Sequence, residues 1–447
     1  MSTGRWPNEH LAAQRRGRRQ PTATPRRPRQ RLDVYLEDRK LGELERQGPT
    51  RYRFRYADEA VERHGDGTLL LSASLPLRAA AFPNGETKPF FEGLLPEGAT
   101  RAAIARSFGL SEDNGFGLLA ELGSDCAGAV VILPAGTPPP SAGSGSIDWL
   151  TDDQLVQRIE DLPRNPLGIT DAEGRVRLSL AGVQPKLVVT RSPSGRIGQP
   201  TGGAPSTHLL KPAQERYPDL VANEAFCLRV ARSVGLRAAN AKIVTFGDRE
   251  CLLVERWDRT IDGDGRITRL HQEDFCQALG RLPSAKYEVE GGPSFAEMIA
   301  LLRSMGAPTL ARDVLELLRA LVLNFVLGNA DAHGKNYALL YETLGVPGLA
   351  PLYDIVSTSV YADVNPRLAM RIGAVDDADA VDLAAWSSLA VESGLGAQVT
   401  RTASAFAARV VASARALREL SRAEGWHRPV LDGIVALAER RAARLGL

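Results

Sequence analysis

Four polar side chains crowd one short stretch of this sequence, GNADAHGKNY (328–337), in which an aspartate, a histidine, a lysine and an asparagine share six positions. The stretch follows the apolar run LRALVLNFVLGN, which is typical of a buried helix. A buried helix that ends in so many polar groups suits a site for a reaction between charged groups. Phosphoryl transfer is one: it needs a carboxylate to accept a proton, oxygen ligands for Mg²⁺ and a lysine for the nucleotide phosphates.

The spacing inside this stretch fits that chemistry. Asp331 precedes Asn336 by five positions, the separation between the proton-accepting Asp and the metal-binding Asn of the protein-kinase catalytic loop. Downstream, APLYDIVS places Asp354 among apolar, strand-like residues, so we expect a metal-binding carboxylate at a strand end. The arginine that precedes the base in common protein kinases is absent. A polar loop that ends a helix explains the Asp–Asn pair equally well.

Two upstream stretches add candidate phosphate contacts. SLAGVQPK (179–186) has a glycine in a turn between strands, whose backbone N–H groups can cradle phosphates, although a plain hairpin turn is the simpler interpretation. Lys211 lies in the apolar strand HLLKP, where an unpaired lysine is rarely tolerated. Glu224, in the helical stretch NEAF, is a candidate partner, as in kinases; surface exposure of either residue is the alternative.

The elements that must position these residues follow from periodicity. Before a Pro/Gly/Ser linker at 135–146 we expect a hairpin in RLDVYLEDRKLGELE, strands in RYRFRYA and LLLSASLPL, a loop and helix in PFFEGLLPEGATRAAIARSFGL, and a helix, turn and strand in FGLLAELGSDCAGAVVILP. After the linker we expect a capped helix in DWLTDDQLVQRIEDLP, strands flanking the glycine turn, a strand in STHLLKP, a helix in LVANEAFCLRVARSVGL and a hairpin in AKIVTFGDRECLLVERWDR. Helical patterns dominate from about residue 270, which predicts a site between a strand-rich and a helix-rich half.

Composition sets further bounds. The chain has 447 residues, of which 44% are hydrophobic and 24% charged, as is ordinary for globular proteins. No apolar run reaches the roughly 18 residues that span a bilayer, and the N-terminus has no apolar core of a secretory signal. The four cysteines are far apart and form no CxxC pair, so we expect neither a disulfide framework nor a zinc site. A reducing cytoplasm is the natural setting.

The net charge of +2 is unevenly spread. Residues 1–31 hold nine arginines and one glutamate, a charge of +8, which leaves −6 for the remainder. A general nucleic-acid-binding surface on the body therefore has no support from net charge. The Pro- and Arg-rich tail should be disordered. It is either an arm that gathers near nucleic-acid phosphates or, as we favour, a solvated tail or residues upstream of the true start.

Taken together, these stretches resemble the HipA family of bacterial serine/threonine kinases, the toxins of type II toxin–antitoxin pairs. The resemblance runs from about Leu32 to near the C-terminus. The matching stretches are GELE, SASLPL, FFEGLLPEG, LLAELGSDCAGAV, LSLAGVQPK, THLLKP, NEAFCLRVA, VERWDR, HQEDFCQALG, KYEVEGGPSF, GNADAHGKNY and PLYDIVST. The fold it implies is α+β and two-lobed, like a protein kinase, with a strand-rich N-terminal lobe, an extra N-terminal subdomain and a helical C-terminal lobe.

The resemblance also implies boundaries. These are a disordered basic tail (1–31), a HipA-type N-terminal subdomain (32–135), a linker (136–146), the remainder of the N-lobe with phosphate loop and hinge (147–258) and a C-lobe with the catalytic loop (259–447).

Site roles follow from the resemblance by position, with ATP and Mg²⁺ as cofactors. Asp331 is the implied proton acceptor, and Asn336 and Asp354 the implied magnesium ligands. The implied ATP contacts are Ala181, Gly182, Val183, Gln184, Pro185, Lys186, Lys211, Glu255, Arg256, Trp257, His333, Gly334, Lys335, Asn336, Tyr353 and Asp354. Within this set 181–186 is the phosphate loop, and 255–257 is the hinge that receives adenine through backbone groups. Ser179 aligns with the autophosphorylated serine, whose phosphate would eject the loop and switch the kinase off.

Partners are implied in the same way. Family members phosphorylate protein targets such as aminoacyl-tRNA synthetases and so halt translation, and a small helix-turn-helix antitoxin, HipB-like, neutralises them and binds operator DNA. A DNA-contacting loop of the family is basic, whereas the stretch here is the acidic AVDDADAVD, so we expect contact with operator DNA mainly through the antitoxin. Two alternatives stay open: a lipid or small-molecule kinase of the same fold, and a catalytically idle transcriptional co-repressor.

Overall fold

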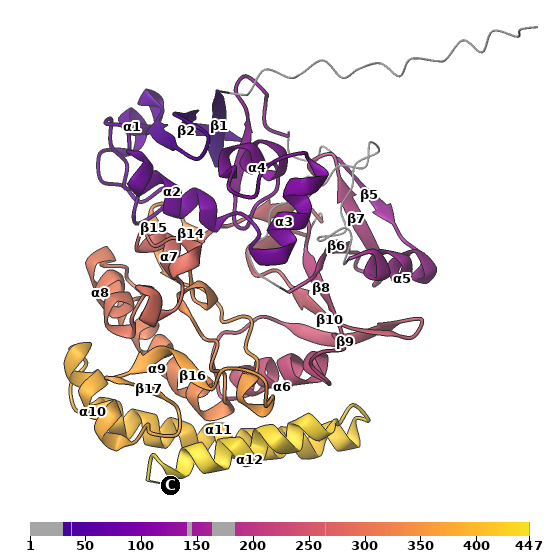
Figure 1. Ribbon diagram of the computed structural model, residues 1–447, viewed down its shortest axis with the longest axis vertical. Coiled ribbons are helices and arrows are strands. Elements are labelled where there is room, and N and C mark those ends of the chain that lie inside the picture. Colours follow the sequence, from indigo (N-terminus) through magenta and orange to yellow (C-terminus); the bar gives the residue numbers. More distant parts are fainter. Residues whose placement is uncertain (1–29, 37, 141–144, 163–183, 264, 447) are drawn as a thin grey trace, which may run out of the picture.

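The computed structural model describes residues 30–36, 38–140, 145–162, 184–263 and 265–446. Three packed parts share the molecule, and each contains helices and strands (Figure 1). A four-stranded sheet with its helices lies at the top of the view, a six-stranded sheet lies at the right, and long helices lie at the bottom. Within the described residues, every helix is too short or too polar to cross a membrane.

The N-terminal part is built on a sheet in the order β3-β2-β1-β4. Its elements are β1 (Arg31–Leu36), β2 (Arg39–Arg46), β3 (Tyr52–Tyr56), α1 (Asp58–His64), α2 (Asn84–Gly93), α3 (Gly98–Ser107), α4 (Gly115–Leu122) and β4 (Val130–Pro134). The predicted hairpin is confirmed, because β1 and β2 pair antiparallel. Alternation in β3 buries Tyr52, Phe54 and Tyr56 and exposes the arginines between them, which seals one face of the sheet with aromatic rings.

Two predictions for this part are wrong. The stretch LLLSASLPL (69–77) forms no named strand and makes only two isolated bridges. It is a largely buried irregular segment whose polar groups are hydrogen-bonded to the C-terminal part. Its apolar character reflects burial on both sides, which a strand and a buried loop share. The stretch PFFEG is not a loop but the second half of α2, with Pro89 inside the helix and Phe90 and Phe91 buried.

The second sheet has the order β5-β7-β6-β8-β10-β9. Its part comprises β5 (Ser146–Trp149), α5 (Asp152–Asp161), β6 (Leu187–Arg191), β7 (Ile197–Thr201), β8 (His208–Pro212), α6 (Leu220–Ser233), β9 (Ala241–Phe246) and β10 (Arg249–Glu255). Helix α5 begins with the expected cap, a capping box between Thr151 and Gln154. The strand expected before the glycine turn, together with Ser179, Ala181, Gly182 and Val183, lies outside the described residues. So do residues 1–29 and part of the linker, and the domain boundaries stay a prediction.

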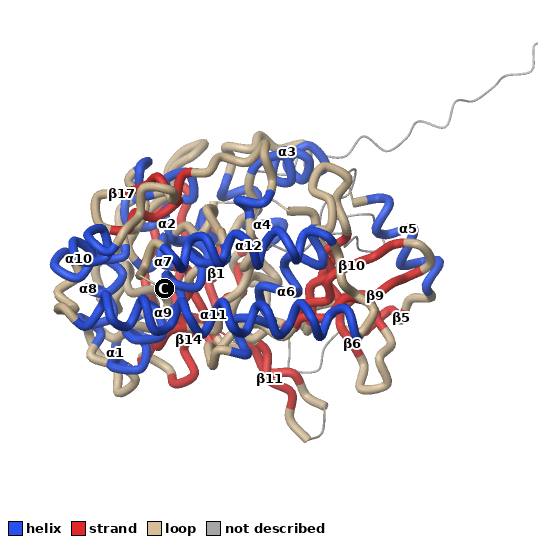
Figure 2. The backbone as a smooth tube through the Cα atoms, turned by 90° about the horizontal axis from the view of Figure 1, so that it is seen from below, coloured by secondary structure: helices blue, strands red, loops and turns tan. Residues whose placement is uncertain are grey.

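The C-terminal part is helical but holds more strands than expected. Its elements are β11 (Arg259–Ile261), β12 (Ile267–Arg269), β13 (His271–Asp274), α7 (Phe275–Ala278), η1 (Pro283–Ala285), η2 (Glu288–Glu290), α8 (Phe295–Met305), α9 (Leu310–Leu327), η3 (Gly334–Asn336), β14 (Ala338–Thr343), β15 (Val346–Leu349), η4 (Thr358–Val360), β16 (Arg367–Ile372), β17 (Val375–Asp377), α10 (Leu383–Glu392), α11 (Gln398–Ala423) and α12 (Pro429–Ala443). Helices α11 and α12 run side by side beneath the molecule (Figures 1 and 2). They cover α9, whose second half is buried. Because the polar stretch GNADAHGKNY follows the end of α9 directly, the position of this buried helix also sets the position of that stretch.

Candidate active site

The catalytic-type loop starts where α9 stops. Gly328 ends the helix with φ 81°, a left-handed conformation that favours glycine, and a Cβ there would collide with the Leu437 side chain. The side chain of Asn336 then donates a hydrogen bond to the carbonyl oxygen of Asp331 at 3.0 Å. This bond closes the loop across five positions and explains why the two residues keep that spacing.

Asp331 keeps its carboxylate at the edge of the protein, partly exposed. Its Oδ1 accepts a hydrogen bond from the hydroxyl of Tyr287 at 2.7 Å. Its backbone N–H donates to the side-chain oxygen of Asn329 at 3.1 Å, which fixes the main chain under the carboxylate. A fixed and accessible carboxylate has the properties that a proton acceptor for an incoming hydroxyl requires.

A lysine and two carboxylates form the second half of the site. The ammonium of Lys211, on β8, lies 2.7 Å from Glu224 on α6 and 2.8 Å from Asp354. Burial opposes the lysine charge, but Asp354 and Glu224 outweigh it and raise the pKa of Lys211, so the side chain stays protonated. Lys211 in turn lowers the pKa of Asp354 to about 2, so that carboxylate stays ionised.

The apolar neighbours of Asp354 predicted a strand end at this position, and this prediction is wrong. Asp354 lies in an irregular segment after β15 and has φ 56°, a left-handed conformation that Asp tolerates better than most residues. This backbone turn brings the carboxylate to Lys211 and leaves 45% of the side chain exposed.

Lys186 and His333 connect the two halves electrostatically. Burial and the nearby ammonium of Lys211 lower the pKa of Lys186 to about 8, and Asp354 partly offsets the fall. Burial lowers the pKa of His333, while Asp331 and Asp354 both act to raise it. The charges of both predicted carboxylates therefore act on the pKa of one imidazole.

The remaining residues of the loop serve its packing. The ammonium of Lys335 contacts Asp274 at 2.9 Å and Glu97 at 3.5 Å, so its charge is balanced inside the protein. A Cβ on Gly334 would lie 2.6 Å from Pro293, which leaves room for glycine alone. The hydroxyl of Tyr353 donates to the carbonyl oxygen of Lys335 at 2.6 Å and so ties the loop to the segment of Asp354.

The predicted hinge follows β10. The ring of Trp257 packs against that of Tyr353 with centroids 5.8 Å apart, which builds an aromatic wall beside the site. The backbone N–H of Arg256 is already bonded to the carbonyl oxygen of Thr207 at 2.9 Å, and that of Glu255 to Asn240 at 2.8 Å. Adenine recognition by hinge backbone groups stays a prediction, and these two N–H groups are occupied.

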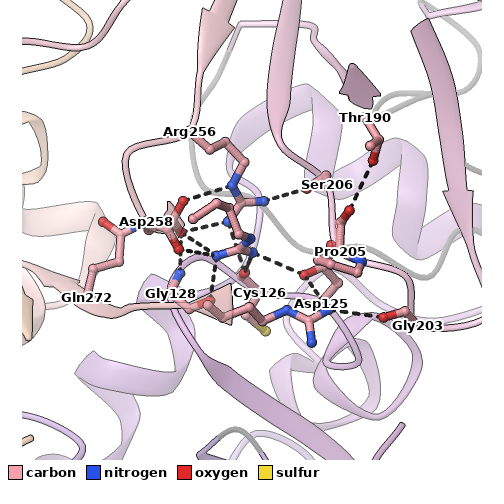
Figure 3. A network of polar contacts seen from close by, with 12 residues as sticks. Asp125, Cys126, Gly128, Thr190, Gly203, Pro205, Ser206, Arg256, Asp258 and Gln272 are labelled. Carbon is pink, nitrogen blue, oxygen red and sulfur yellow. Dashed lines mark hydrogen bonds and ion pairs between the residues drawn. The ribbon is translucent and has the colours of Figure 1, made fainter. Parts of the chain in front are cut away.

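The side chain of Arg256 belongs to a buried ion network with Asp258 (Figure 3). Asp258 is at its centre and accepts hydrogen bonds from Arg256 at 2.7 Å and from the backbone N–H of Gly128 at 2.8 Å. Arg259 contacts the same carboxylate at 3.0 Å. The network thus joins the hinge to the N-terminal part, a link that spacing in the sequence did not indicate.

The residues present fit a magnesium ion. The bond from Asn336 to Asp331 uses the amide nitrogen, so the amide oxygen of Asn336 is the atom left for a ligand. Asp354 offers a second carboxylate oxygen beside the one that Lys211 holds. Both are hard oxygen donors, which Mg²⁺ prefers alongside water and nucleotide phosphates.

Sequence reasoning missed several residues around the site. Tyr287, Glu97 and Asp274 contact Asp331 or Lys335 directly, and Asp258 supports the hinge. Their stretches KYEVEGGPSF, FFEGLLPEG, HQEDFCQALG and VERWDR were among those that carried the family resemblance. A signal was therefore present, but it gave no role to the individual side chains.

Fold and site together define a protein-kinase-like protein, with a strand lysine paired to a helix glutamate beside a catalytic-type loop. Family models then place it more closely. The model described as HipA-like C-terminal domain matches residues 178–417, and the model described as HipA N-terminal domain matches residues 32–133. The chain belongs to the HipA family of kinases, which confirms the resemblance inferred from its motifs.

Individual relatives agree. The chain is 42% identical over 378 residues to Y4mE of Sinorhizobium fredii, named provisionally as a kinase, which covers 83% of this chain and 87% of that one. It is 36% identical over 338 residues to the serine/threonine-protein kinase toxin HipA of Shewanella oneidensis, covering 73% and 75% of the two chains.

A solved structure of Shewanella oneidensis HipA with HipB and its operator DNA superposes with a TM-score of 0.76 at 30% identity. The superposition covers 93% of this chain and 96% of the other, and the predicted two-lobed kinase-like fold is thereby confirmed.

Proposed function

We propose that this chain is an ATP- and Mg²⁺-dependent protein serine/threonine kinase. The observation that carries the proposal is that one segment, residues 353–354, contacts both halves of the site: Asp354 holds the ammonium of Lys211 at 2.8 Å, and the hydroxyl of Tyr353 donates to the carbonyl oxygen of Lys335 in the loop of Asp331 at 2.6 Å. A paired cation, two separate carboxylates and an amide oxygen are the groups that phosphoryl transfer from ATP needs. A general acid–base site for another reaction would not require a buried lysine–glutamate pair.

The mechanism assigns one task to each group. The oxygen of the substrate hydroxyl forms a bond to the γ-phosphorus, and Asp331 accepts the proton that this hydroxyl loses. The bond between the γ-phosphorus and the oxygen that bridges it to the β-phosphate breaks, which releases ADP. Asn336 and Asp354 would hold Mg²⁺, which neutralises charge on the phosphates when bound. Lys211 and Lys186, with the loop 181–186, hold phosphate oxygens, with His333 and Gly334 on the same side. The ammonium of Lys335 stays paired with Asp274 and Glu97 and supports the loop.

The remaining site assignments belong to the same proposal. Adenine lies at the hinge 255–257, beside the aromatic wall that Trp257 and Tyr353 form together. Ser179 is the site of autophosphorylation, and its phosphate switches the kinase off by ejecting the phosphate loop.

The biological role we propose is that of a cytoplasmic toxin. The similarity to Shewanella oneidensis HipA, which was solved with HipB and operator DNA, supports a HipB-like helix-turn-helix antitoxin as partner. Contact with operator DNA would run mainly through that antitoxin, because the stretch after β16 is acidic. The target is a protein of translation, such as an aminoacyl-tRNA synthetase.

The replacement Asp331→Gln tests the chemistry. We expect it to fold and to bind ATP in calorimetry, but to lose transfer of label from γ-labelled ATP to proteins of a cell extract. The replacement Asp248→Asn, at an exposed turn after β9, is the control and should keep full activity. Retained transfer by the first variant would refute the base. Label in lipid or metabolites, or no ATP binding by the unmodified protein, would favour the two alternative functions instead.

The toxin role has its own test. Expression of the unmodified chain should arrest growth of a bacterial host, and Asp331→Gln should not. Co-expression of the HipB-like antitoxin should restore growth. Arrest by the inactive variant would separate toxicity from phosphoryl transfer and contradict the proposal.

A further inference from the structure

Tyr287 touches the proposed base, although neither the predicted site nor the mechanism above includes it. Its hydroxyl donates to Oδ1 of Asp331 at 2.7 Å. Its ring meets that of His333 edge-on, with centroids 5.3 Å apart and planes at 86°. The phenol is therefore held at two points of the catalytic-type loop.

The residues on either side of Tyr287 reach two other parts of the molecule. The ammonium of Lys286 lies 3.2 Å from the carboxylate of Glu97, which belongs to the N-terminal part. The carboxylate of Glu288 accepts two hydrogen bonds from Arg371 on β16, one from its backbone N–H at 2.7 Å and one from its guanidinium at 2.9 Å. Three successive residues, 286–288, thus contact three separate elements, and we call them the brace.

The backbone of the brace is tied down as well. The carbonyl oxygen of Lys286 accepts a hydrogen bond from the N–H of Gly334, inside the catalytic-type loop, at 3.3 Å. The carbonyl oxygen of Tyr287 accepts from Gly292 at 2.9 Å, and Gly291 provides the required turn with φ 88°. The position of the Tyr287 hydroxyl is therefore set from both ends of the segment.

A carboxylate on a partly exposed loop samples several rotamers unless another group holds it. A donor on one oxygen fixes the plane of the carboxylate and leaves the other oxygen for the substrate hydroxyl. A misplacement of about 1 Å in a reacting group is enough to cost on the order of a hundredfold in rate. Fixing the base is therefore an effect large enough to measure in the rate of transfer.

We propose that Tyr287 is a positioning residue for Asp331, and that Lys286 and Glu288 hold it in place by tying it to the N-terminal part and to β16. The inference rests on the proposed kinase function. It gives the N-terminal part a role in catalysis: Glu97 acts on the base through Lys286 and Tyr287, without contact with Asp331 itself.

The replacement Tyr287→Phe tests this. We expect the maximal rate of label transfer from γ-labelled ATP to extract protein to fall about tenfold or more. The KM for ATP and the melting temperature should stay unchanged, because among the described residues the hydrogen bond of the lost hydroxyl goes to the base. Tyr35→Phe is the matched control: it also removes a hydroxyl near an aspartate, Asp33 at 3.5 Å, but on β1. Its rate should equal that of the unmodified protein.

The coupling through the brace has a separate readout. Glu288→Gln should lower the maximal rate by a smaller factor, and the double variant with Tyr287→Phe should be no slower than Tyr287→Phe alone, because Glu288 acts through the Tyr287 hydroxyl. If the losses of rate in the two single variants add up in the double variant, Glu288 does not act through Tyr287, and the proposed role of the brace is wrong.

The remaining outcomes separate this inference from the proposed function. An unchanged or faster Tyr287→Phe enzyme, or a loss of rate matched by a rise in KM for ATP or a lower melting temperature, would overturn the positioning role while the kinase function stands. An unmodified protein without any transfer would overturn the kinase function, and the inference with it.

Discussion

Lys211 and Glu224 lie thirteen positions apart in the sequence, yet the lysine nitrogen and a glutamate oxygen are 2.7 Å apart inside the protein. Only 7% of the lysine side chain and 2% of the glutamate side chain are exposed. Because β8 supplies one partner and α6 the other, the pair also fixes the helix against the sheet. A buried lysine is rarely tolerated without such a partner, so the pair decides between the two interpretations that the sequence left open, pairing and surface exposure.

The replacement Lys211→Met should damage both stability and ATP binding. It leaves Glu224 buried without its partner, which should lower the free energy of unfolding by about 3–5 kcal/mol. ATP affinity in calorimetry should fall at least tenfold, because a phosphate contact is lost. The double variant Lys211→Met, Glu224→Leu should regain most of the stability in urea unfolding but none of the affinity. Recovery of ATP binding by the double variant would show that Lys211 does not contact the phosphates.

The replacement Lys335→Met separates two roles for a residue of the catalytic-type loop. The side chain is buried against Asp274 and Glu97, so its removal should lower the free energy of unfolding by about 2–4 kcal/mol in urea. ATP affinity should change less than threefold, because the ammonium is already paired. An unchanged stability with a tenfold weaker affinity would instead mean that Lys335 reaches the nucleotide, as the resemblance implies.

Sequence reasoning succeeded where one physical constraint acts alone. Strand alternation located β1, β2 and β3. A lysine inside an apolar strand drew attention to Lys211, the kinase pattern suggested Glu224 as its partner, and the structure shows the pair rather than the exposed alternative. The spacing of Asp331 and Asn336 was noticed because it matches the protein-kinase catalytic loop, and the structure joins the two residues by a hydrogen bond within one short loop.

Sequence reasoning failed where long-range contacts decide the conformation. Asp354 was expected at a strand end, but it has a left-handed backbone in an irregular segment, and its carboxylate contacts Lys211, which is 143 positions away in the sequence. The stretch 69–77 looked like a strand because it is apolar, yet polar groups of Ser72 and Ala73 are hydrogen-bonded to Glu273, two hundred residues later in the sequence. Tyr287 belongs to the same class, since its partner Asp331 lies 44 positions away.

The buried network of Figure 3 should make Asp258 a critical residue for stability. Burial opposes its charge, but Arg256 and Arg259 outweigh this and hold the pKa of Asp258 well below its usual range. Asp258→Asn removes the charge that both guanidiniums face, so we expect a loss of about 3–5 kcal/mol in urea unfolding.

The matched control is Glu439→Gln, which breaks a pair with Arg415 at 2.7 Å on the exposed faces of α11 and α12. It should change the free energy of unfolding by less than about 1 kcal/mol. Equal effects of the Asp258 and Glu439 replacements would contradict the view that burial, rather than the ion pair itself, makes the network essential.

Glu273 should give the protein a distinct pH dependence. The residue joins β13 to the N-terminal part, because its carboxyl accepts hydrogen bonds from the hydroxyl of Ser72 at 2.5 Å, the N–H of Ala73 at 2.9 Å and the hydroxyl of Tyr341 at 2.6 Å. Burial raises the pKa of Glu273 from 4.5 to about 7, more than these three donors lower it. The folded protein therefore keeps a proton that the unfolded chain releases at a lower pH.

This difference makes the contribution of Glu273 to the free energy of unfolding fall as pH rises from about 4.5 to about 7, because the folded state binds more protons throughout that range. Glu273→Gln keeps an uncharged side chain at every pH, with an oxygen for Ala73 and Tyr341 and an amide group for Ser72. Relative to the unmodified protein, the variant should therefore gain up to about 3 kcal/mol between pH 5 and pH 8. Urea unfolding at both pH values measures this, and Glu342→Gln, exposed on β14, should show no such gain. A difference that stays constant with pH would mean that the three donors keep Glu273 ionised in the folded protein.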